Sequence, residues 1–444
     1  MALDQLKDSY NLVIFATAPA GLGHLRVSHA LQDGFPENVA SFVFGAFDPS
    51  LTYLHRLSSL NPFFRYLQYL VQYHPSIEQV FTDFYRSYLR NNPEETEKQL
   101  LTLLNTHQPP PATAVVVATH FGLAHEIASL KPIIESKLKV KIQLYVVVTD
   151  DTFHKIWAVD GAEAIIVPSL HTKNLLSNYF SQKKFKKPDI LVNPYPLAPQ
   201  LGIFPAKILL ERKKQLSLKS HETTQVIIPI SGAAVQLGNL ENIIKGLSQI
   251  SPKTFHSLIV SKQTSYTSPF LSRLSRLKNV SQTTATTDRE TVDLYEKVFK
   301  QKEVPTLEIT KPSEHAFKVL FTPKELGGVI LLFTEPVGRQ EEDNLQFLYR
   351  HHLLPTSQEN SVLERQLLSN QPSLSKEILE KAHHWRGLIL PQDPQRAITY
   401  IRNARDLGLF SQMLKFVRSH DSESAHDGVA RFWQLVNERL PSHD

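Results

Sequence analysis

Short runs of strongly apolar residues recur along the chain and constrain its fold more than any other feature. In the first half they occupy 11–18, 41–47, 114–119, 142–149 and 163–168. Each is rich in Val, Ile, Leu or Phe, is too short for a typical helix, and is separated from the next by a segment with helical spacing. This alternation predicts a parallel sheet that helices cover on both faces.

The pattern starts again after a connector rich in Pro and Lys, which we place at about 181–222. Further apolar runs follow at 225–230, 256–261, 305–310 and 328–333. A chain of 444 residues has room for two or three domains at roughly 150 residues each. We therefore predict an α/β protein with two Rossmann-like, doubly wound domains facing a cleft.

Domain boundaries are expected where the pattern breaks. The predicted domains are an N-terminal one over 1–197, a second over 198–395, and C-terminal helices over 396–444 that pack back on the N-terminal domain. The last part contains two amphipathic segments, AITYIRNARDLGLF and GVARFWQLVNERL. Each is expected to form one helix that covers a core.

Composition excludes several classes of protein. The chain has no cysteine, which excludes disulfides, thiolate catalysis and cysteine metal sites. A net charge of +5 does not indicate a nucleic-acid binder. The N-terminus MALDQLKDSY lacks the pattern of a signal peptide, and no apolar stretch reaches about 18 residues. We expect a cytoplasmic protein whose membrane contact, if it has one, is peripheral.

The turn APAGLGH follows the first apolar run. Gly21 and Gly23 lie between the expected strand and helix, and His24 begins the helix. Glycines allow a ligand close to the backbone, and a helix N-terminus favours anionic groups. Arg26 stands where the GxGxxG fingerprint has its third glycine, so a plain strand–helix turn remains an alternative. Because an imidazole ordinarily has a pKa of about 6.5, His24 is a candidate base.

The segment VVVTDDTFHKIW follows a buried run and brings Asp150, His154 and Trp157 to the carboxyl end of the sheet. Ligands bind at this end in open α/β folds. Asp150 is a candidate base or the group that orients His154. The alternative is that Asp150 and Asp151 only cap a helix.

Two polar segments stand out in the second half, ITKPSEHAFKVL and VGRQEEDNLQFL. Glu314, near a helix start, can accept both hydroxyls of a ribose. Gln340, Glu341 and Asn344 form a polar cluster after an apolar run, and such a cluster suits sugar hydroxyls. A solvated charged face is the alternative interpretation.

Taken together, AGLGH, VVTDDTFHKIW, TKPSEHAF and GRQEEDN resemble the family of monogalactosyldiacylglycerol synthases and processive diacylglycerol glucosyltransferases. More distantly they are similar to the GlcNAc-transferase that completes lipid II. The order and spacing match over roughly residues 10 to 350. The resemblance implies a GT-B fold, with the acceptor on the N-terminal domain and the nucleotide sugar on the C-terminal one.

The resemblance also implies roles for single residues. His120 falls near a further family histidine, although Phe121 replaces the usual proline, and Ser313 replaces the usual glycine before Glu314. The turn SGAAVQLGN has fewer glycines than is usual in the family. The implied sets are His24, Asp150 and His154 for catalysis; Gly21, Gly23, His120 and Trp157 for the acceptor; and Ser231, Gly232, Ser313, Glu314, Gln340, Glu341 and Asn344 for the donor.

The implied activity is a hexosyltransferase that moves a hexose or N-acetylhexosamine from a UDP-sugar to a membrane lipid such as diacylglycerol, with inversion. No D-x-D occurs in the chain, so we expect no metal, and no cofactor besides the UDP-sugar co-substrate. Two alternatives are a nucleotide-sugar epimerase of the same shape and a non-catalytic descendant that binds nucleotide sugar or lipid.

The stretch 51–90 is crowded with Tyr, Phe and Leu and carries four arginines, at positions 56, 65, 86 and 90. Aromatic and basic residues on an amphipathic stretch suit a lipid interface. The lysines at 183, 184, 186 and 187 add positive charge. We expect the stretch to contact an anionic membrane surface. The alternative is that its aromatic residues belong to the core.

Overall fold

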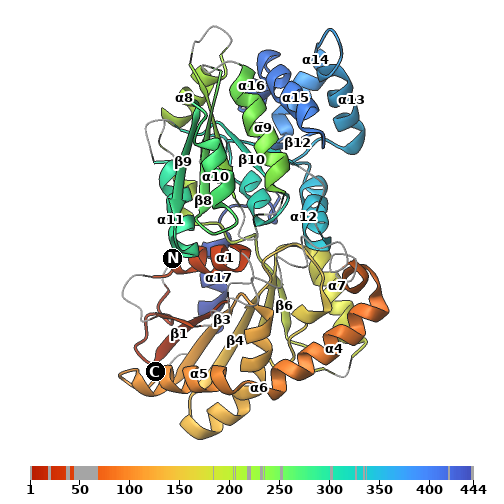
Figure 1. Ribbon diagram of the computed structural model, residues 1–444. Helices are drawn as coiled ribbons and strands as arrows, with labels where there is room; N and C mark the ends of the chain where they lie inside the picture. The colour runs from red at the N-terminus through yellow and green to blue at the C-terminus, as the bar shows by residue number, and fades with distance from the viewer. Residues whose placement is uncertain are drawn as a thin grey trace. The chain divides into compact units, whose positions relative to one another are not determined.

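The chain divides into two compact units in a computed structural model (Figure 1). The first comprises Met1–Pro199, Gly338–Gln340 and Ala425–Asp444, and the second Gln200–Val337 and Glu341–Ser424. The structure describes residues 3–18, 22–36, 41–44, 69–183, 185–203, 205, 207–217, 222–230, 234, 236–250, 254–300, 304–325, 328–333, 336, 338–418 and 421–441.

A six-stranded sheet forms the centre of the first unit. Every described strand pair in it is parallel, and the strand order is β2-β1-β3-β4-β5-β6. Because β1 lies between β2 and β3, the direction of winding reverses there. The strands are β1 (Asn11–Ala16), β2 (Ser41–Phe44), β3 (Thr113–Ala118), β4 (Lys141–Val147), β5 (Ala164–Val167) and β6 (Asp189–Val192).

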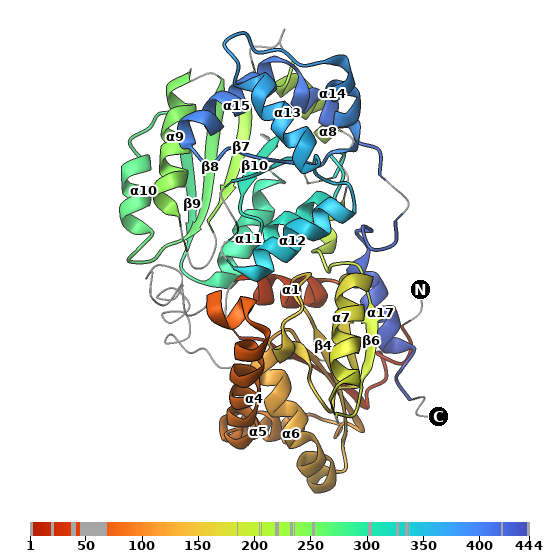
Figure 2. The same cartoon turned by 90° about the vertical axis from the view of Figure 1, so that its right-hand side faces the viewer.

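Helices pack on this sheet and bury its apolar side chains (Figures 1 and 2). The side chains of β1, β3 and β4 are almost wholly buried, as the continuous apolar runs predict. The described helices are α1 (Leu22–Asp33), α4 (Pro75–Asn91), α5 (Glu94–Thr106), α6 (Phe121–Leu138), the 3-10 turn η1 (Lys155–Trp157), α7 (Leu170–Ser181) and α17 (Gly428–Asn437).

The second unit has its own six-stranded sheet and its own apolar core. Its described pairs are also parallel, in the order β12-β11-β10-β7-β8-β9, so the winding reverses between β7 and β10. The strands are β7 (Thr224–Pro229), β8 (Phe255–Lys262), β9 (Val280–Ala285), β10 (Leu307–Thr310), β11 (Val329–Leu332) and β12 (Gly387–Ile389).

Helices and short 3-10 turns surround the second sheet (Figure 2). The helices are α8 (Lys207–Gln215), α9 (Leu237–Ile250), α10 (Ser268–Leu274), α11 (Asp288–Val298), α12 (Arg339–Arg350), α13 (Ser357–Leu367), α14 (Lys376–Lys381), α15 (Pro394–Asp406) and α16 (Leu409–Met413). The 3-10 turns are η2 (Pro199–Gly202), η3 (Glu314–Leu320) and η4 (Ala382–His384). The α/β class and the two doubly wound halves are thus confirmed.

The predicted connector at 181–222 is more structured than expected. It contains β6, which pairs with β5 in the first sheet, and helix α8 of the second unit. The Pro and Lys residues that surround β6 and α8 interrupt the apolar pattern by which these two short elements would be predicted from the sequence. Strands β9 and β12 were also not predicted.

The C-terminal segments differ from the expectation in two ways. Gly408 adopts φ +78° and divides the first segment into α15 and α16, since a residue in that conformation does not continue a helix. Both helices bury apolar side chains in the core of the second unit. By contrast, α17 packs in the first unit, where the indole N–H of Trp433 donates to the Leu31 carbonyl at 2.9 Å.

Within the described part of the chain, none of the helices is both long and apolar enough to span a bilayer.

Candidate functional site

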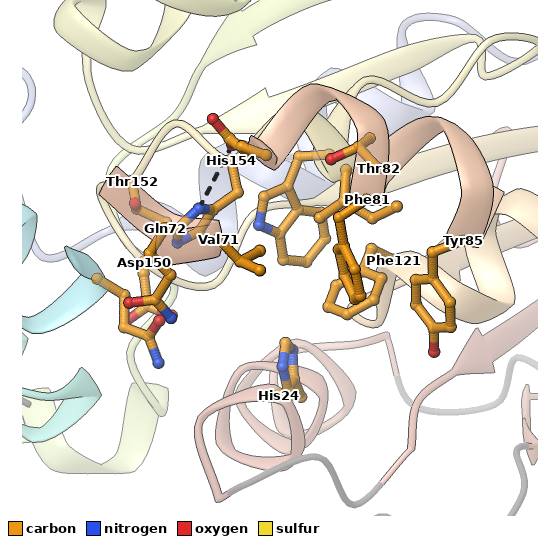
Figure 3. Close-up of a pocket in the computed structure, with 14 residues that line it drawn as sticks. His24, Val71, Gln72, Phe81, Thr82, Tyr85, Phe121, Asp150, Thr152 and His154 are labelled. Carbon is orange, nitrogen blue, oxygen red and sulfur yellow. Dashed lines mark ion pairs between the residues drawn. The ribbon is translucent and has the colours of Figure 1, made fainter. Parts of the chain in front are cut away.

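A cavity of about 290 Å³ opens in the first unit at the carboxyl ends of β1, β3 and β4 (Figure 3). Residues that follow these strands line it together with residues of α4 and of the segment before α4. One further residue comes from the short segment Gly338–Gln340, which groups with the first unit. The lining residues are His24, Val71, Gln72, Glu78, Phe81, Thr82, Tyr85, Phe121, Asp150, Thr152, His154, Ile156, Trp157 and Gln340.

The cavity has an aromatic side and a polar side. Figure 3 shows Phe81, Phe121 and Tyr85 together at one side, Asp150, Thr152 and Gln72 at the other, and His24 reaching in from its own helix. Such a combination suits a ligand with an apolar body and a few polar groups.

His24 lies in the first turns of α1, the helix that follows β1. Its Nδ1 is 2.6 Å from the carbonyl oxygen of Thr119 and 3.2 Å from the hydroxyl oxygen of Thr149. A carbonyl oxygen can only accept, so Nδ1 carries the proton in this bond. The neutral ring then has its lone pair on Nε2, which is the form that a general base needs.

His120 and Trp157 surround the His24 ring. The ring centroid of His120 lies 5.4 Å from that of His24, edge-on, and Trp157 lies 6.1 Å away. Burial, with a smaller contribution from His24, lowers the pKa of His120 to about 3. His120 is therefore an uncharged ring near neutral pH, and it stacks on Phe121 at 4.8 Å.

The two neighbouring aspartates have different environments. Asp151 is buried and accepts hydrogen bonds from the hydroxyls of Ser169 and Thr172 at the start of α7. Asp150 lines the cavity instead. Asp151 thus holds the two hydroxyls at the start of α7, and Asp150 is the aspartate that lines the cavity.

Glu78, from α4, is the carboxylate beside His154. Its Oε1 is 3.7 Å from Nδ1 of His154 and accepts from the Lys155 amide at 3.0 Å. Its Oε2 is 3.7 Å from both the Lys155 ammonium and the Arg339 guanidinium. Burial alone would raise the pKa of Glu78, but these partners outweigh it and hold the pKa below its usual range. Glu78 is therefore a buried carboxylate anion in the cavity wall.

Sequence reasoning did not single out Glu78, Gln72 or the aromatic wall. In the sequence, Glu78 is one charge among several within 51–90, and Phe121 is notable only for standing where the family has a proline. No local pattern distinguishes Glu78 from the half-exposed Asp83 one turn later. The signal is tertiary, because α4 packs against η1 and α6.

The same stretch orients its arginines differently from our expectation. Arg86 is buried, donates to the Lys155 carbonyl at 3.1 Å and lies over the Phe185 ring. Arg90 donates to the Asp160 carbonyl at 3.2 Å. Both side chains turn toward the protein, so they do not provide an outward basic surface. The other two arginines, at 56 and 65, lie outside the described residues, as does the lysine at 184.

The candidate donor residues of the second unit follow β10 and β11. Ser313 and Glu314 come directly after β10, and Nε2 of His315 is 3.7 Å from the Glu314 carboxylate. The Ser313 hydroxyl is buried and has no hydrogen-bond partner among the described residues. Since β10 neighbours β7 where the winding reverses, this loop is at the position where doubly wound sheets bind ligands.

The predicted cluster in α12 is divided. Gln340 lines the cavity of the first unit, whereas Glu341 and Asn344 are buried in the second. The Glu341 carboxylate forms an ion pair with Lys311. Of the other predicted residues, Gly23 is half-buried in α1, and Gly21, Ser231 and Gly232 lie outside the described residues.

The described residues contain no group of three or more His, Asp and Glu that could hold a metal ion.

Fold and site together define a protein with two Rossmann-like units and a ligand cavity beside a histidine. No protein-family model and no curated protein matches the chain. Among solved structures it is similar to MnaA from S. aureus with UDP, at 10% identity and TM-score 0.45, over 97% of this chain and 99% of that chain. It is also similar to MurG from Acinetobacter baumannii, at 9% identity and TM-score 0.44, over 96% of this chain and 99% of that chain. The spinosyn rhamnosyltransferase SpnG is similar at 12% identity and TM-score 0.44, again over 96% of this chain and 99% of that chain. These TM-scores are too low for the similarities to support a fold or an activity.

Proposed function

We propose that the chain is a GT-B glycosyltransferase of the diacylglycerol-glycosylating kind that its motifs resemble. It transfers a hexose or N-acetylhexosamine from a UDP-sugar to a membrane lipid such as diacylglycerol. The observation that carries this proposal is the cavity in which a histidine with its lone pair on Nε2 meets an aromatic wall. An acceptor with a reactive hydroxyl on an apolar body matches both features.

The reaction is a direct displacement with inversion. His24 Nε2 takes the proton from the acceptor hydroxyl, whose oxygen attacks the anomeric carbon of the sugar. The bond from that carbon to the diphosphate oxygen breaks, and UDP leaves with the electron pair. Asp150 and His154, on the polar side, orient the acceptor hydroxyl. No step requires a metal ion.

The proposed donor residues lie in the second unit, apart from Gln340, which groups with the first. Glu314 accepts hydrogen bonds from the two ribose hydroxyls, and Ser313, Gln340, Glu341 and Asn344 hold the donor. Ser231 and Gly232, which lie outside the described residues, complete the proposed donor set after β7. The buried, unpartnered hydroxyl of Ser313 supports a polar ligand at this loop.

An exposed apolar stripe on α4 supports a lipid acceptor. We define the α4 stripe as Ile77, Val80, Phe81, Phe84 and Tyr88, which are 41–71% exposed and recur at helical spacing. Phe81 also lines the cavity, so the stripe is continuous with it. A contiguous exposed apolar face marks an interaction site, and an acyl chain entering the cavity from a bilayer would cover it.

Exposed lysines of the first unit support an anionic membrane as the partner. Lys186 and Lys187 are exposed in the segment after α7, and Lys183 lies against Asp83 of α4. We therefore propose a cytoplasmic protein that associates peripherally with the membrane.

Nucleotide binding tests the proposal. The protein is titrated calorimetrically with UDP, GDP, dTDP and NAD, beside Glu314→Ala and the matched control Glu342→Ala, an exposed acid of the second unit. We expect selective UDP binding that only Glu314→Ala abolishes. Binding of another nucleotide would change the donor. If none binds, the non-catalytic alternative replaces the enzyme, and turnover of UDP-sugar without any lipid would indicate the epimerase.

A further inference from the structure

A buried charged network in the second unit ends at Glu314. Its members are Glu308 on β10, Tyr295 on α11, and Lys318 and His315 on η3, all at most 5% exposed. Buried charges persist in proteins when they are paired and hydrogen-bonded. This network meets that condition at the Lys318 ammonium.

The Lys318 ammonium can donate three hydrogen bonds and lies among polar side chains of β10, α11 and η3. It contacts the Glu308 carboxylate, the Tyr295 hydroxyl at 2.5 Å and Nδ1 of His315 at 3.0 Å. The Tyr295 hydroxyl in turn donates to the second carboxylate oxygen of Glu308 at 2.7 Å. An ammonium group can only donate, so Nδ1 of His315 is the acceptor in its contact.

That contact determines which nitrogen of His315 carries the proton. With a lone pair on Nδ1, the neutral ring has its hydrogen on Nε2. Nε2 is 3.7 Å from the Glu314 carboxylate oxygen, which is longer than a hydrogen bond, so its N–H acts on that oxygen as an electrostatic contact. In the other tautomer a lone pair would face the carboxylate and repel it.

We propose that Lys318, held by Glu308 and Tyr295, fixes His315 as the Nε2–H tautomer and thereby orients Glu314 to accept the vicinal hydroxyls of a ribose. This inference rests on the proposed function for its ligand. His315 and Lys318 are positioning residues, since they act through Glu314. Neither was singled out from the sequence, because their relation depends on the turn of η3 beneath β10.

The tautomer is tested independently of any ligand. ¹⁵N chemical shifts of the histidine rings are recorded on the full chain, and the His315 signals are assigned from their loss in His315→Gln. We expect the Nε2–H pattern in the wild type. We expect it to disappear in the double variant Glu308→Gln, Lys318→Met, which removes both buried charges together and avoids an unpaired one. An Nδ1–H ring or a doubly protonated ring in the wild type overturns the proposal.

The role of the ring is tested by UDP affinity. In His315→Phe, which keeps an aromatic ring but has no donor, we expect affinity to fall about tenfold. In His315→Gln, whose amide N–H can replace Nε2–H, we expect it within about threefold of wild type. The matched control is His256→Phe, which removes a half-buried histidine bonded to Gln225 in the same unit.

A nucleotide without the 2′ and 3′ hydroxyls shows whether His315 acts on ribose binding through Glu314 or only on the structure in general. With 2′,3′-dideoxy-UDP, His315→Phe and wild type should bind alike, because the orientation of Glu314 no longer matters. Equal UDP binding by wild type and His315→Phe overturns the proposal and leaves the proposed function intact. If the wild type binds no nucleotide, the proposed function fails and the ribose role fails with it, while the tautomer experiment still decides what Lys318 does.

Discussion

Nδ1 of His24 lies 2.6 Å from the main-chain carbonyl oxygen of Thr119. His24 follows β1 and Thr119 follows β3, so the bond joins the ends of two adjacent strands where the winding of the sheet reverses. The main-chain carbonyl after β3 thus sets the tautomer of His24, which lies in the helix after β1. A candidate base is held in its active form before any ligand binds.

His24→Ala is expected to lower the transfer rate by about 10²–10⁴, the usual contribution of a positioned general base. The fold should persist, since the side chain is only half-buried. Single-turnover rates measure the effect. The control is His107→Ala, which removes a half-buried histidine whose Nδ1 likewise contacts a main-chain carbonyl, that of Pro109. A wild-type rate in His24→Ala would remove this residue from the mechanism.

Asp150→Ala and Asp151→Ala should separate activity from stability. Asp151→Ala leaves the hydroxyls of Ser169 and Thr172 without their acceptor, which should cost about 1–3 kcal/mol of unfolding free energy. Asp150→Ala should slow transfer by at least about 10²-fold with little change in stability. Urea unfolding and transfer rates on both variants measure the two effects. A loss of stability in Asp150→Ala together with a loss of transfer rate in Asp151→Ala would contradict these roles.

Removing the α4 stripe should weaken membrane binding without unfolding the protein. The double variant Val80→Ser, Phe84→Ser replaces side chains that are 71% and 70% exposed. Burial of each in a bilayer contributes about 1.5–3 kcal/mol, so vesicle affinity should fall at least about tenfold. Co-sedimentation with anionic vesicles at low and high salt measures it. Ile133→Ser, at an exposed site on α6, is the control, and equal losses in both would remove any special role of α4.

Stability should fall in acid partly through His125. Burial lowers the pKa of His125 to about 3, and the nearby Arg86 and Arg90 act in the same direction. The unfolded chain, with an ordinary pKa of about 6.5, then binds this proton while the folded chain does not. The folded state therefore loses stability as the pH falls from about 6.5 toward 3, by up to about 1.4 kcal/mol per pH unit for one proton.

His125→Gln should make that pH dependence shallower by one proton. A Gln amide can still donate to the Ile156 carbonyl, which Nε2 of His125 contacts at 2.8 Å. Urea unfolding at several pH values between about 6 and 4 gives the slope. The control is His107→Gln, at a half-buried histidine of the same unit, which should leave the slope unchanged. An unchanged slope in His125→Gln would mean that His125 is protonated in the folded protein.

The central strands could be predicted from sequence because they are buried on both faces. β1, β3 and β4 are continuous apolar runs for this reason. The three strands that were not predicted, β6, β9 and β12, each lie at an edge of a sheet. Edge strands bury less surface, and β9 (VSQTTA) is mostly half-exposed, so its sequence has no apolar run.

The residues of the site could be predicted from the sequence only where they follow a strand. His24, Asp150, His154 and Trp157 do so, and all four line one cavity. Glu78 could not be found this way, since it comes from a helix whose orientation depends on tertiary packing. Helical amphipathicity predicts apolar residues inside, but α4 buries Glu78 and Arg86 and exposes the α4 stripe.

Glycosylation of a lipid is detected by following the labelled sugar into the lipid product. The protein is incubated with UDP-sugars radiolabelled in the sugar and with vesicles containing diacylglycerol and anionic lipid, and the lipid extract is analysed. We expect a labelled glycolipid with inverted anomeric configuration, formed in step with UDP release and about 10²–10⁴-fold more slowly with His24→Ala. Lipid that remains unlabelled with every UDP-sugar, from protein that binds both UDP and vesicles, would contradict the account.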